Sequence, residues 1–347
     1  MLPQAAPRRG GKRRRGNLAA METVTNRVEL ALEPSQPFRL DLTALALVRR
    51  PSNLIDVWEA GAYRRVVPLG EPGPAAPEAE PVLLEVRSAG KLDGTPFDER
   101  LHVSVTGRWS EAELARAGER AATRLLGLDA DLSGFYVVAA ADERLAPVAE
   151  RLRGLRPPRY PSVFEALLNA VPCQQVTLVL GLTLLGRLAR AYGPEVPFAP
   201  LDHATGPLPL PSAASLAAAD PADLGALGFS GTKARALIEL SQRASSGEVA
   251  LSVLPQEANE AVAGTLRSLH GVGRWTSDYV LLRGLGRLDV FPHGDSGARN
   301  GLARFLGAEG KPDYEWVARA VAPWQPFAGF VYLHLLVAGM LERAAAR

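Results

Sequence analysis

This chain lacks the residues that several common kinds of binding site require. It has one cysteine, Cys173, which excludes an intramolecular disulfide and any zinc or iron–sulfur site built from thiolates. No apolar run approaches the roughly 20 residues that cross a membrane, and no apolar segment typical of secretion signals follows the N-terminal charges. We therefore expect a cytoplasmic protein that has no membrane contact and no thiolate-bound cofactor.

A net positive charge is also missing from most of the chain. The formal charge is +2, but six of the 39 basic residues lie in the first twenty positions, where there is no acid. They are Arg8, Arg9, Lys12, Arg13, Arg14 and Arg15. Without these six, 33 basic side chains remain against 37 acidic ones, a net charge of −4. Composition therefore gives little support to nucleic-acid binding, and any contact with a polyanion must be local, through backbone amides and a few arginines.

Residues 1–20 are rich in proline, glycine and arginine and have no periodic apolar pattern. This composition predicts a disordered arm, which would add weak, salt-sensitive affinity for phosphates. In the alternative interpretation, translation begins at Met21 and the arm does not belong to the native protein. N-terminal sequencing of the native protein separates the two.

What the chain does contain is enough apolar material for sizeable cores, with 47% hydrophobic residues among 347. Residues 21–150 have a mixed pattern. Strand-like alternation at 24–32, 63–69, 82–88 and 101–106 is combined with helical spacing at 38–50 and a helix from Ser110 to about Leu126. These signals predict an α+β N-terminal domain with a small antiparallel sheet.

The pattern changes after residues 151–161, whose three prolines and four arginines predict a linker. Residues 162–347 are predicted to form an all-α domain of about eight helices, separated by glycine and proline. The helical stretches are 163–192 with a division at Pro172, 213–219, 222–227, 232–244, 256–269, 275–285, 297–306, 314–321 and 327–343.

A glycine pair lies between two of these helical stretches. Gly271 and Gly273 permit a tight reversal of the chain, because glycine reaches positive φ at little cost. The amides of residues 272–275 would then point from the start of the next helix, where unpaired N–H groups favour an anion such as a phosphate. Taken alone this G-x-G pattern is weak evidence, and an ordinary corner between two helices is the more frequent explanation.

The surrounding residues make the pattern much more specific. Residues 269–279 read LHGVGRWTSDY, and Asp295 follows after the sequence VFPHG. This arrangement resembles the helix-hairpin-helix DNA glycosylases, in particular the bacterial alkylated-base glycosylases. Further matching segments are 164–165, 169–177, 227–230, 233–234 and 322–327, with 40–41 and 63–67 in the N-terminal half. The resemblance covers nearly all of residues 21–347.

The resemblance implies that Asp295 is the catalytic aspartate. Release of a base develops positive charge on the sugar, which a nearby carboxylate stabilises while it orients the attacking water. The alternative role of Asp295 is to cap the helix that opens near Gly297, a frequent use of aspartate. The two roles are compatible.

The family's pocket aromatics correspond to Trp275 and Tyr279, which lie four residues apart and so share a helix face. An alkylated purine is cationic, and a cation over such a ring gains roughly 0.5–2 kcal/mol. The alternative is plain core packing, and we expect a split role. Ser296 and Leu333 stand at pocket positions that are often aromatic in relatives, so this pocket is expected to be less aromatic and roomier.

The resemblance also assigns DNA contacts and a cation site. The DNA-binding residues of the hairpin are Gly271, Val272, Gly273, Arg274 and Thr276. Gln174 and Gln175 are the candidates for a wedge that fills the space left by an extruded base, with Gln175 preferred; a capped turn between helices is the alternative. The backbone carbonyls of Arg267, Leu269 and Val272 would bind a monovalent cation, and no other cofactor is implied.

Relatives that also cut the DNA strand have a lysine where this chain has Trp275, and no lysine occurs between Lys233 and Lys311. The missing lysine therefore predicts a monofunctional enzyme. Together with it, the resemblance implies a glycosylase that removes alkylated purines of the 3-methyladenine type from double-stranded DNA, and we expect a monomer. Two alternatives stay open: a glycosylase for deaminated or other lesions, and a non-catalytic helix-hairpin-helix protein that binds DNA damage.

Overall fold

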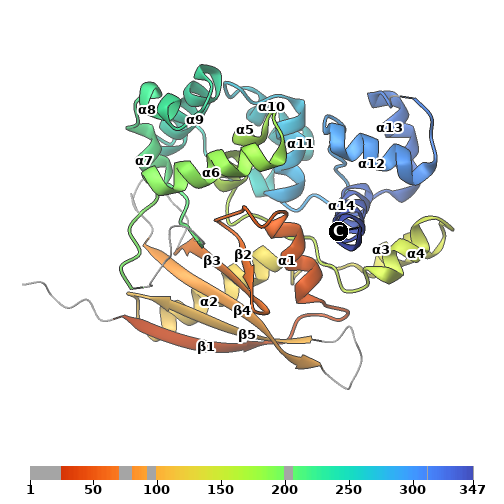
Figure 1. The fold of residues 1–347 in the computed structure, drawn as a ribbon, viewed down its shortest axis with the longest axis horizontal. Helices are drawn as coiled ribbons and strands as arrows, with labels where there is room; N and C mark the ends of the chain where they lie inside the picture. The colour runs from red at the N-terminus through yellow and green to blue at the C-terminus, as the bar shows by residue number, and fades with distance from the viewer. Residues whose placement is uncertain (1–24, 70–79, 92–98, 199–205, 311, 347) are drawn as a thin grey trace, which may run out of the picture.

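The computed structural model describes residues 25–69, 80–91, 99–198, 206–310 and 312–346. The first third of this chain forms a sheet with helices packed on it, and the rest is helical (Figure 1). Residues 1–20, for which we predicted a disordered arm, lie outside the described residues.

The sheet is antiparallel and has five strands in the order β1-β5-β4-β3-β2. The strands are β1 (Asn26–Leu32), β2 (Val57–Glu59), β3 (Ala62–Pro68), β4 (Pro81–Lys91) and β5 (Glu99–Gly107). The predicted small antiparallel sheet is thus confirmed. Strand β2 was not predicted, because three residues are too few to show alternation.

Two helices share the core of this sheet. Helix α1 (Leu40–Val48) and helix α2 (Glu111–Leu126) pack their apolar side chains with those of β3, β4 and β5. Helix α2 begins as the sequence predicts: Ser110 caps the backbone N–H of Glu113, and the Glu113 carboxylate accepts from the Ser110 backbone.

The apolar core does not divide at residue 150. Helices α3 (Ser133–Ala140) and α4 (Leu145–Arg151) pack with α14 (Ala328–Ala345) near the other end of the chain. The connecting segment 151–161 adds Leu152, Leu155 and Tyr160, which are fully buried. One core cluster therefore ties the N-terminal third to the C-terminal helices.

Residues 162–346 are helical in all their longer elements, as predicted. The helices before α14 are α5 (Val163–Cys173), α6 (Leu178–Tyr192), α7 (Ala213–Ala217), α8 (Pro221–Ala226), α9 (Gly231–Ser245), α10 (Asn259–Arg267), α11 (Arg274–Arg283), α12 (Ser296–Leu306) and α13 (Tyr314–Val321), with short 3-10 turns at Leu254–Gln256 and Ala322–Trp324. The predicted break at Pro172 falls slightly later, because α5 continues through Cys173 and Thr177 caps α6.

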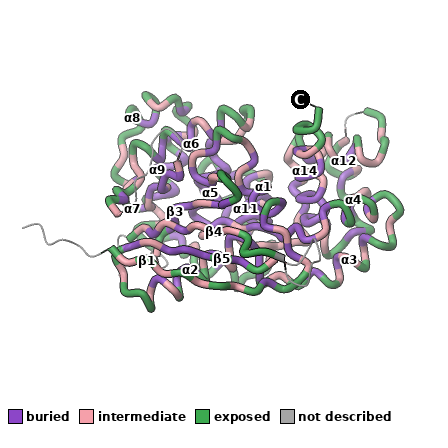
Figure 2. Tube along the Cα trace, turned by 60° about the horizontal axis from the view of Figure 1, so that its bottom comes forward, coloured by how far each residue is buried: buried purple, intermediate pink, exposed green. Residues whose placement is uncertain are grey.

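Helix α14 is 18 residues long and apolar enough, by length and composition alone, to cross a membrane. More than half of it, 56%, is buried within the protein, which is also true of the core helix of a folded domain. Figure 2 shows this helix with buried turns that lead to an exposed C-terminal end.

Candidate nucleic-acid and base-binding site

A cleft of about 1250 Å³ brings together most of the residues that the sequence singled out. Its walls come from the loop between α5 and α6, the turn before α11, the first turns of α11 and α12, and one face of α14. Figure 1 shows α11 and α12 facing each other above α14. Segments more than 150 residues apart in sequence therefore meet at one cavity.

The predicted hairpin is the turn between α10 and α11. Gly271 has φ +74°, and a Cβ at this position would lie 2.7 Å from the Cβ of Ala236, so the turn requires glycine on both grounds. Gly273 differs from the expectation: its φ is −97° and a Cβ there would meet nothing within 4 Å. Its missing side chain instead leaves the start of α11 open.

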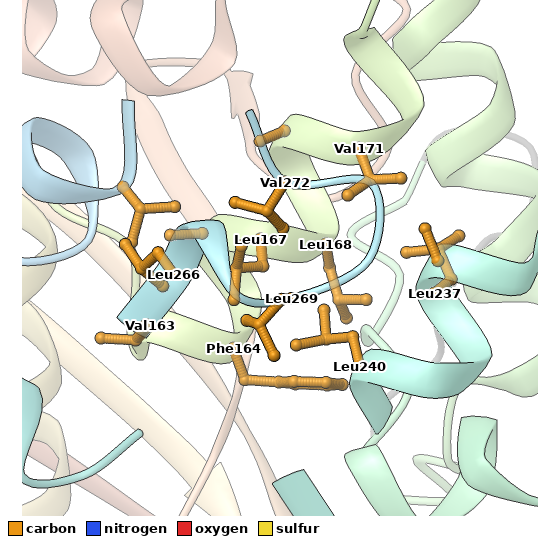
Figure 3. Packing of buried hydrophobic residues seen from close by; sticks show 14 of the residues in the cluster. Val163, Phe164, Leu167, Leu168, Val171, Leu237, Leu240, Leu266, Leu269 and Val272 are labelled. Atoms are coloured by element: carbon orange, nitrogen blue, oxygen red, sulfur yellow. The ribbon is translucent and has the colours of Figure 1, made fainter. Parts of the chain in front are cut away.

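The hairpin is held by its apolar side chains. Leu266, Leu269 and Val272 are buried in the same cluster as residues of α5 and α9. Figure 3 shows these three side chains gathered with Leu167 and Leu168 of α5. Because protein cores are close-packed, this arrangement fixes the course of the hairpin backbone.

The first turn of α11 has unsatisfied backbone donors. No side chain caps it, and no acceptor for the backbone N–H groups of Arg274, Trp275 and Thr276 is found among the described residues. Such N–H groups together with the helix dipole favour an anion. The side chains of Val272 and Thr276 are buried, so these two predicted DNA contacts can be made only through their backbone.

The two glutamines at the end of α5 have different surroundings. The Gln174 side chain donates to the Gly271 carbonyl at 2.8 Å and to the Thr276 hydroxyl at 3.0 Å, so it braces the hairpin. Gln175 is exposed at the rim of the cleft and has φ +53°, an unusual value for a residue with a side chain. Only Gln175 is free to enter a neighbouring molecule.

Asp295 lies at the cleft with both carboxylate oxygens occupied. Its Oδ1 accepts from the backbone N–H of Ala298 at 2.9 Å, which caps α12, and its Oδ2 accepts from Trp275 Nε1 at 3.1 Å. The cap that was an alternative to a chemical role is therefore present and orients the carboxylate toward Trp275. Ser296, the next residue, is exposed at the cleft wall.

The aromatic pair is also present. The rings of Trp275 and Tyr279 are stacked with centroids 5.6 Å apart. Trp275 is half-buried, whereas Tyr279 is buried and its hydroxyl forms a 2.7 Å hydrogen bond with that of Tyr160. Burial holds the pKa of Tyr279 well above its ordinary value, so this hydroxyl stays neutral. Both residues line the cleft while anchored in the core.

The prediction for Leu333 is wrong. Leu333 is 1% exposed, belongs to the core cluster around α14, and does not line the cleft. The face of α14 that borders the cleft has Tyr332, Leu335 and Leu336, spaced by three and four residues. Each residue turns a helix by about 100°, so Leu333, one position after Tyr332, points into the core.

Sequence reasoning missed several residues of the cleft, and Arg49 is the one that lies farthest from the others in the sequence. Arg49, at the C-terminal end of α1, lines the cleft although α1 belongs to the sheet-containing part of the chain. It is 8% exposed, and its guanidinium donates to the Tyr279 hydroxyl and to Asn169 Oδ1, both at 3.3 Å. No local pattern could have indicated it, since the nearest site residue is more than 100 positions away.

The carbonyls predicted to bind a monovalent cation lie at the end of α10 and in the hairpin. The Leu269 carbonyl accepts from the Val272 N–H at 3.1 Å. No hydrogen bond to the carbonyl of Arg267 or Val272 is found within the described ranges, so these oxygens are available to a ligand. Carbonyl oxygens are suitable donors for a hard cation.

Comparison with known proteins agrees with this geometry. The family model described as HhH-GPD superfamily base excision DNA repair protein matches residues 168–326. DNA-3-methyladenine glycosylase 2 of Escherichia coli is 31% identical over 52% of this chain and 60% of its own length. The DNA-3-methyladenine glycosylase of Bacillus subtilis is 27% identical over 60% of this chain and 67% of its own length. The chain thus spans about three fifths to two thirds of the length of these curated relatives.

Solved structures share the fold over most of the chain. The 3-methyladenine DNA-glycosylase from Archaeoglobus fulgidus has a TM-score of 0.72 at 23% identity and covers 90% of this chain and 98% of its own. A structure titled MBOgg1 in complex with low affinity DNA ligand has a TM-score of 0.68 at 18% identity and covers 90% of this chain and 96% of its own. The hairpin, the cleft and the match over residues 168–326 lead to one conclusion: this segment is similar to the HhH-GPD superfamily of base excision DNA repair proteins.

Proposed function

We propose that this protein is a monofunctional DNA glycosylase that removes alkylated purines of the 3-methyladenine type from double-stranded DNA. The observation that carries the proposal is the Asp295 carboxylate, which is fixed at the cleft by Ala298 and Trp275. As the N-glycosidic bond breaks, its electron pair leaves with the base and positive charge develops on the sugar. The carboxylate stabilises that charge, water adds to the sugar carbon, and the water's proton passes to the carboxylate or to solvent.

The DNA would be held at the start of α11. A backbone phosphate that accepts from the free N–H groups of Arg274, Trp275 and Thr276 needs no lysine, which fits the net charge of −4 outside the first twenty residues. Extrusion of a nucleotide costs a few kcal/mol. Exposed Gln175 is suited to fill the vacated space in the stack and offset part of that cost.

The extruded base would stack on Trp275, whose ring attracts a cationic alkylated purine. Cleavage of the strand by a Schiff base requires an amine in the cleft, and no lysine lines the cleft in the part of the chain that the structure describes. Borohydride should therefore fail to trap a covalent complex between protein and DNA. We further propose that the protein works as a monomer in the bacterial nucleoid, without a cofactor other than a monovalent cation on the hairpin carbonyls.

Two other functions remain in competition with this one. A preference for deaminated or other lesions is favoured by exposed Ser296, a small polar residue at the cleft wall where relatives often have an aromatic ring. A protein that only binds damaged DNA would keep the hairpin but would have no use for a carboxylate oriented by two hydrogen bonds.

The decisive experiment uses methylated duplex DNA and measures the release of 3-methyladenine and 7-methylguanine. The wild-type protein should release both, and Asp295→Asn should reduce the rate by about 100-fold or more, the typical loss when a charge-stabilising group is removed. Asn can still cap α12, so DNA binding should persist in the variant. Equal release by the two proteins would overturn the mechanism, and DNA binding without any release would support the damage-binding alternative.

A further inference from the structure

The lining of the cleft is rich in arginine, although most of the chain is not basic. Within the described part of the chain this lining contains five arginines and a single acid, Asp295. The net charge outside the first twenty residues is −4. A cleft lined by charges of one sign concentrates ligands of the opposite sign. The basic side chains of the cleft are therefore gathered where a polyanion can bind. They are Arg49, Arg274, Arg283, Arg304 and Arg343.

Two of these arginines have guanidinium groups without an intramolecular contact. Of the three that are exposed, Arg274 lies over the Tyr314 ring, with its guanidinium carbon 4.7 Å from the ring centre. Neither Arg304 nor Arg343 has a side-chain hydrogen bond, ion pair or ring contact with any residue that the structure describes. Their donors are therefore available to a ligand in the cleft.

The local structure of α14 directs Arg343 toward the cleft. Gly339 and Arg343 are four residues apart and lie on the helix face that lines the cleft. A Cβ on Gly339 would lie 3.3 Å from a terminal nitrogen of Arg343, so the guanidinium is folded back over the bare backbone of the preceding turn. The neighbouring Glu342 pairs instead with Arg151 of α4, at 3.3 Å. The acid closest in sequence is thus engaged elsewhere and leaves the charge of Arg343 to the cleft.

Arg304 has a similar place on α12. Asn300 and Arg304 are four residues apart on the face of α12 that lines the cleft. Helices α12 and α14 pack against each other (Figure 2), and each has its cleft arginine near its C-terminal end. Asp295 caps the opposite end of α12, nine residues from Arg304. At about 1.5 Å per residue, Arg304 is about 13 Å along the helix from the proposed catalytic acid.

We propose that Arg304 and Arg343, here called the arginine pair, bind backbone phosphates of duplex DNA several base pairs from the extruded nucleotide. This inference rests on the proposed glycosylase function. A guanidinium binds phosphate oxygens through charge-assisted hydrogen bonds. Duplex DNA advances about 3.4 Å per base pair, so the distance from Asp295 to Arg304 corresponds to about four base pairs.

The position of the arginine pair favours DNA over other polyanions. The pair shares one cleft with Asp295 and Trp275, so its ligand is the molecule that presents a base to these two residues. The free N–H groups of α11 would hold one phosphate close to the extruded nucleotide. The arginine pair would hold the duplex at a second place, and two separated contacts fix the direction in which the duplex crosses the cleft.

The first test measures how binding to a duplex with one tetrahydrofuran abasic site depends on salt. Each phosphate contact contributes about 0.9 to the slope of log K against log salt concentration. Arg304→Met and Arg343→Met should each reduce the steepness by about 0.9, and the double variant by about 1.8. Substitution of either residue by lysine keeps the charge and should keep the slope. Arg120→Met removes an exposed arginine from α2, outside the cleft, and should leave the slope unchanged.

The second test locates the contacts by replacing one phosphate at a time with a neutral methylphosphonate. The wild-type protein should lose affinity at a position about four base pairs from the abasic site. The double variant should be indifferent to that replacement, because the contact is already missing. Phosphates beside the abasic site should remain sensitive in both proteins.

The outcomes separate this inference from the proposed function. A double variant with the wild-type salt slope, or with the wild-type sensitivity to every replaced phosphate, would overturn the role of the arginine pair. Base release from methylated duplex DNA is measured independently with the wild-type protein. If no base is released while the slopes differ as expected, the proposed function is refuted and the phosphate contacts stand.

Discussion

The N-termini of two helices meet at the cleft, and they differ in whether a side chain caps their free backbone N–H groups. Helix α12 is capped by its own residue Asp295, which accepts from Ala298. At the N-cap of helix α11 stands Gly273, which has no side chain that could accept a hydrogen bond. The first backbone N–H groups of this helix have no acceptor in the described structure. An N-cap side chain stabilises a helix by about 1 kcal/mol. Helix α11 lacks that stabilisation, and its first backbone N–H groups stay open to an anion.

The aspartates at the start of the two helices also differ in whether their carboxylate oxygens have hydrogen-bond partners. Asp295 has a hydrogen bond on each oxygen and faces the cleft. Asp278, one turn into α11, has a buried Oδ2 without a partner, and burial raises its pKa to about 6 against the opposing effect of Arg274 and Arg267. The aspartate in α11 therefore has an unsatisfied buried oxygen, whereas both carboxylate oxygens of the aspartate that caps α12 accept hydrogen bonds.

The largest effect is expected when α11 is made to resemble α12. Gly273→Asp should introduce a cap, because a Cβ at this position meets nothing within 4 Å and the φ of −97° suits aspartate. Stability should rise by a few tenths of a kcal/mol, while DNA affinity should fall by about tenfold or more through blocked amides and charge repulsion. Fluorescence anisotropy with duplex DNA at fixed salt measures the affinity.

The matched control is Gly273→Asn, which caps the helix without a negative charge. It should lose less affinity than Gly273→Asp, and the difference gives the contribution of charge. If Gly273→Asp binds DNA as tightly as the wild-type protein, the free amides of α11 do not hold a phosphate.

A smaller effect is expected from the link between the two helices. Trp275→Phe keeps an aromatic ring in the cleft but removes the N–H that donates to Asp295 Oδ2. The carboxylate should keep its hydrogen bond from the backbone N–H of Ala298 and lose the second of the two hydrogen bonds that orient it. Base release should slow by about fivefold, the value of one hydrogen bond of about 1 kcal/mol, with DNA affinity nearly unchanged. A loss as large as that of Asp295→Asn would contradict the contribution of a single hydrogen bond of ordinary strength.

The smallest effect concerns Asp278. A carboxyl whose folded pKa is about 6, against about 3.9 when unfolded, binds more protons in the native state between these values. The native state therefore loses stability as pH rises from about 4 to above 6. Asp278→Asn removes this cost, so its melting temperature should exceed that of the wild type by on the order of 2 °C at pH 7.5. The gap should close at pH 4, and a gap that widens on acidification contradicts the assignment.

The parts of the site that sequence could predict are those specified by local spacing. The interval between Trp275 and Tyr279 implies a shared face, and the structure stacks their rings. The aspartate before α12 was weighed as a cap, and it is one. The turn at Gly271 was predicted from two glycines, but only one of them has positive φ. The spacing of the two glycines indicates that the chain reverses, but it does not indicate which of them adopts the positive φ.

Other parts depend on how whole elements rotate and pack. Leu333 and Tyr332 are adjacent in sequence, yet only the second faces the cleft, because the rotation of α14 is set by its packing against α3 and α4. Gln174 and Gln175 are likewise equivalent in sequence, and only contact with the hairpin makes one a brace and leaves the other exposed.

By itself, the sequence indicated the strands of the small sheet, the helical remainder, the hairpin and the acid that follows it, because each is marked by the spacing of residues that are near one another in the chain. Only the tertiary structure brought Arg49 from the N-terminal third under the same cleft as Trp275 and Asp295. Its arrival requires α1 to pack in one core cluster with α14. The physical reason is that local pattern encodes which face of an element is apolar, whereas the partner of that face is chosen by the packing of the complete chain.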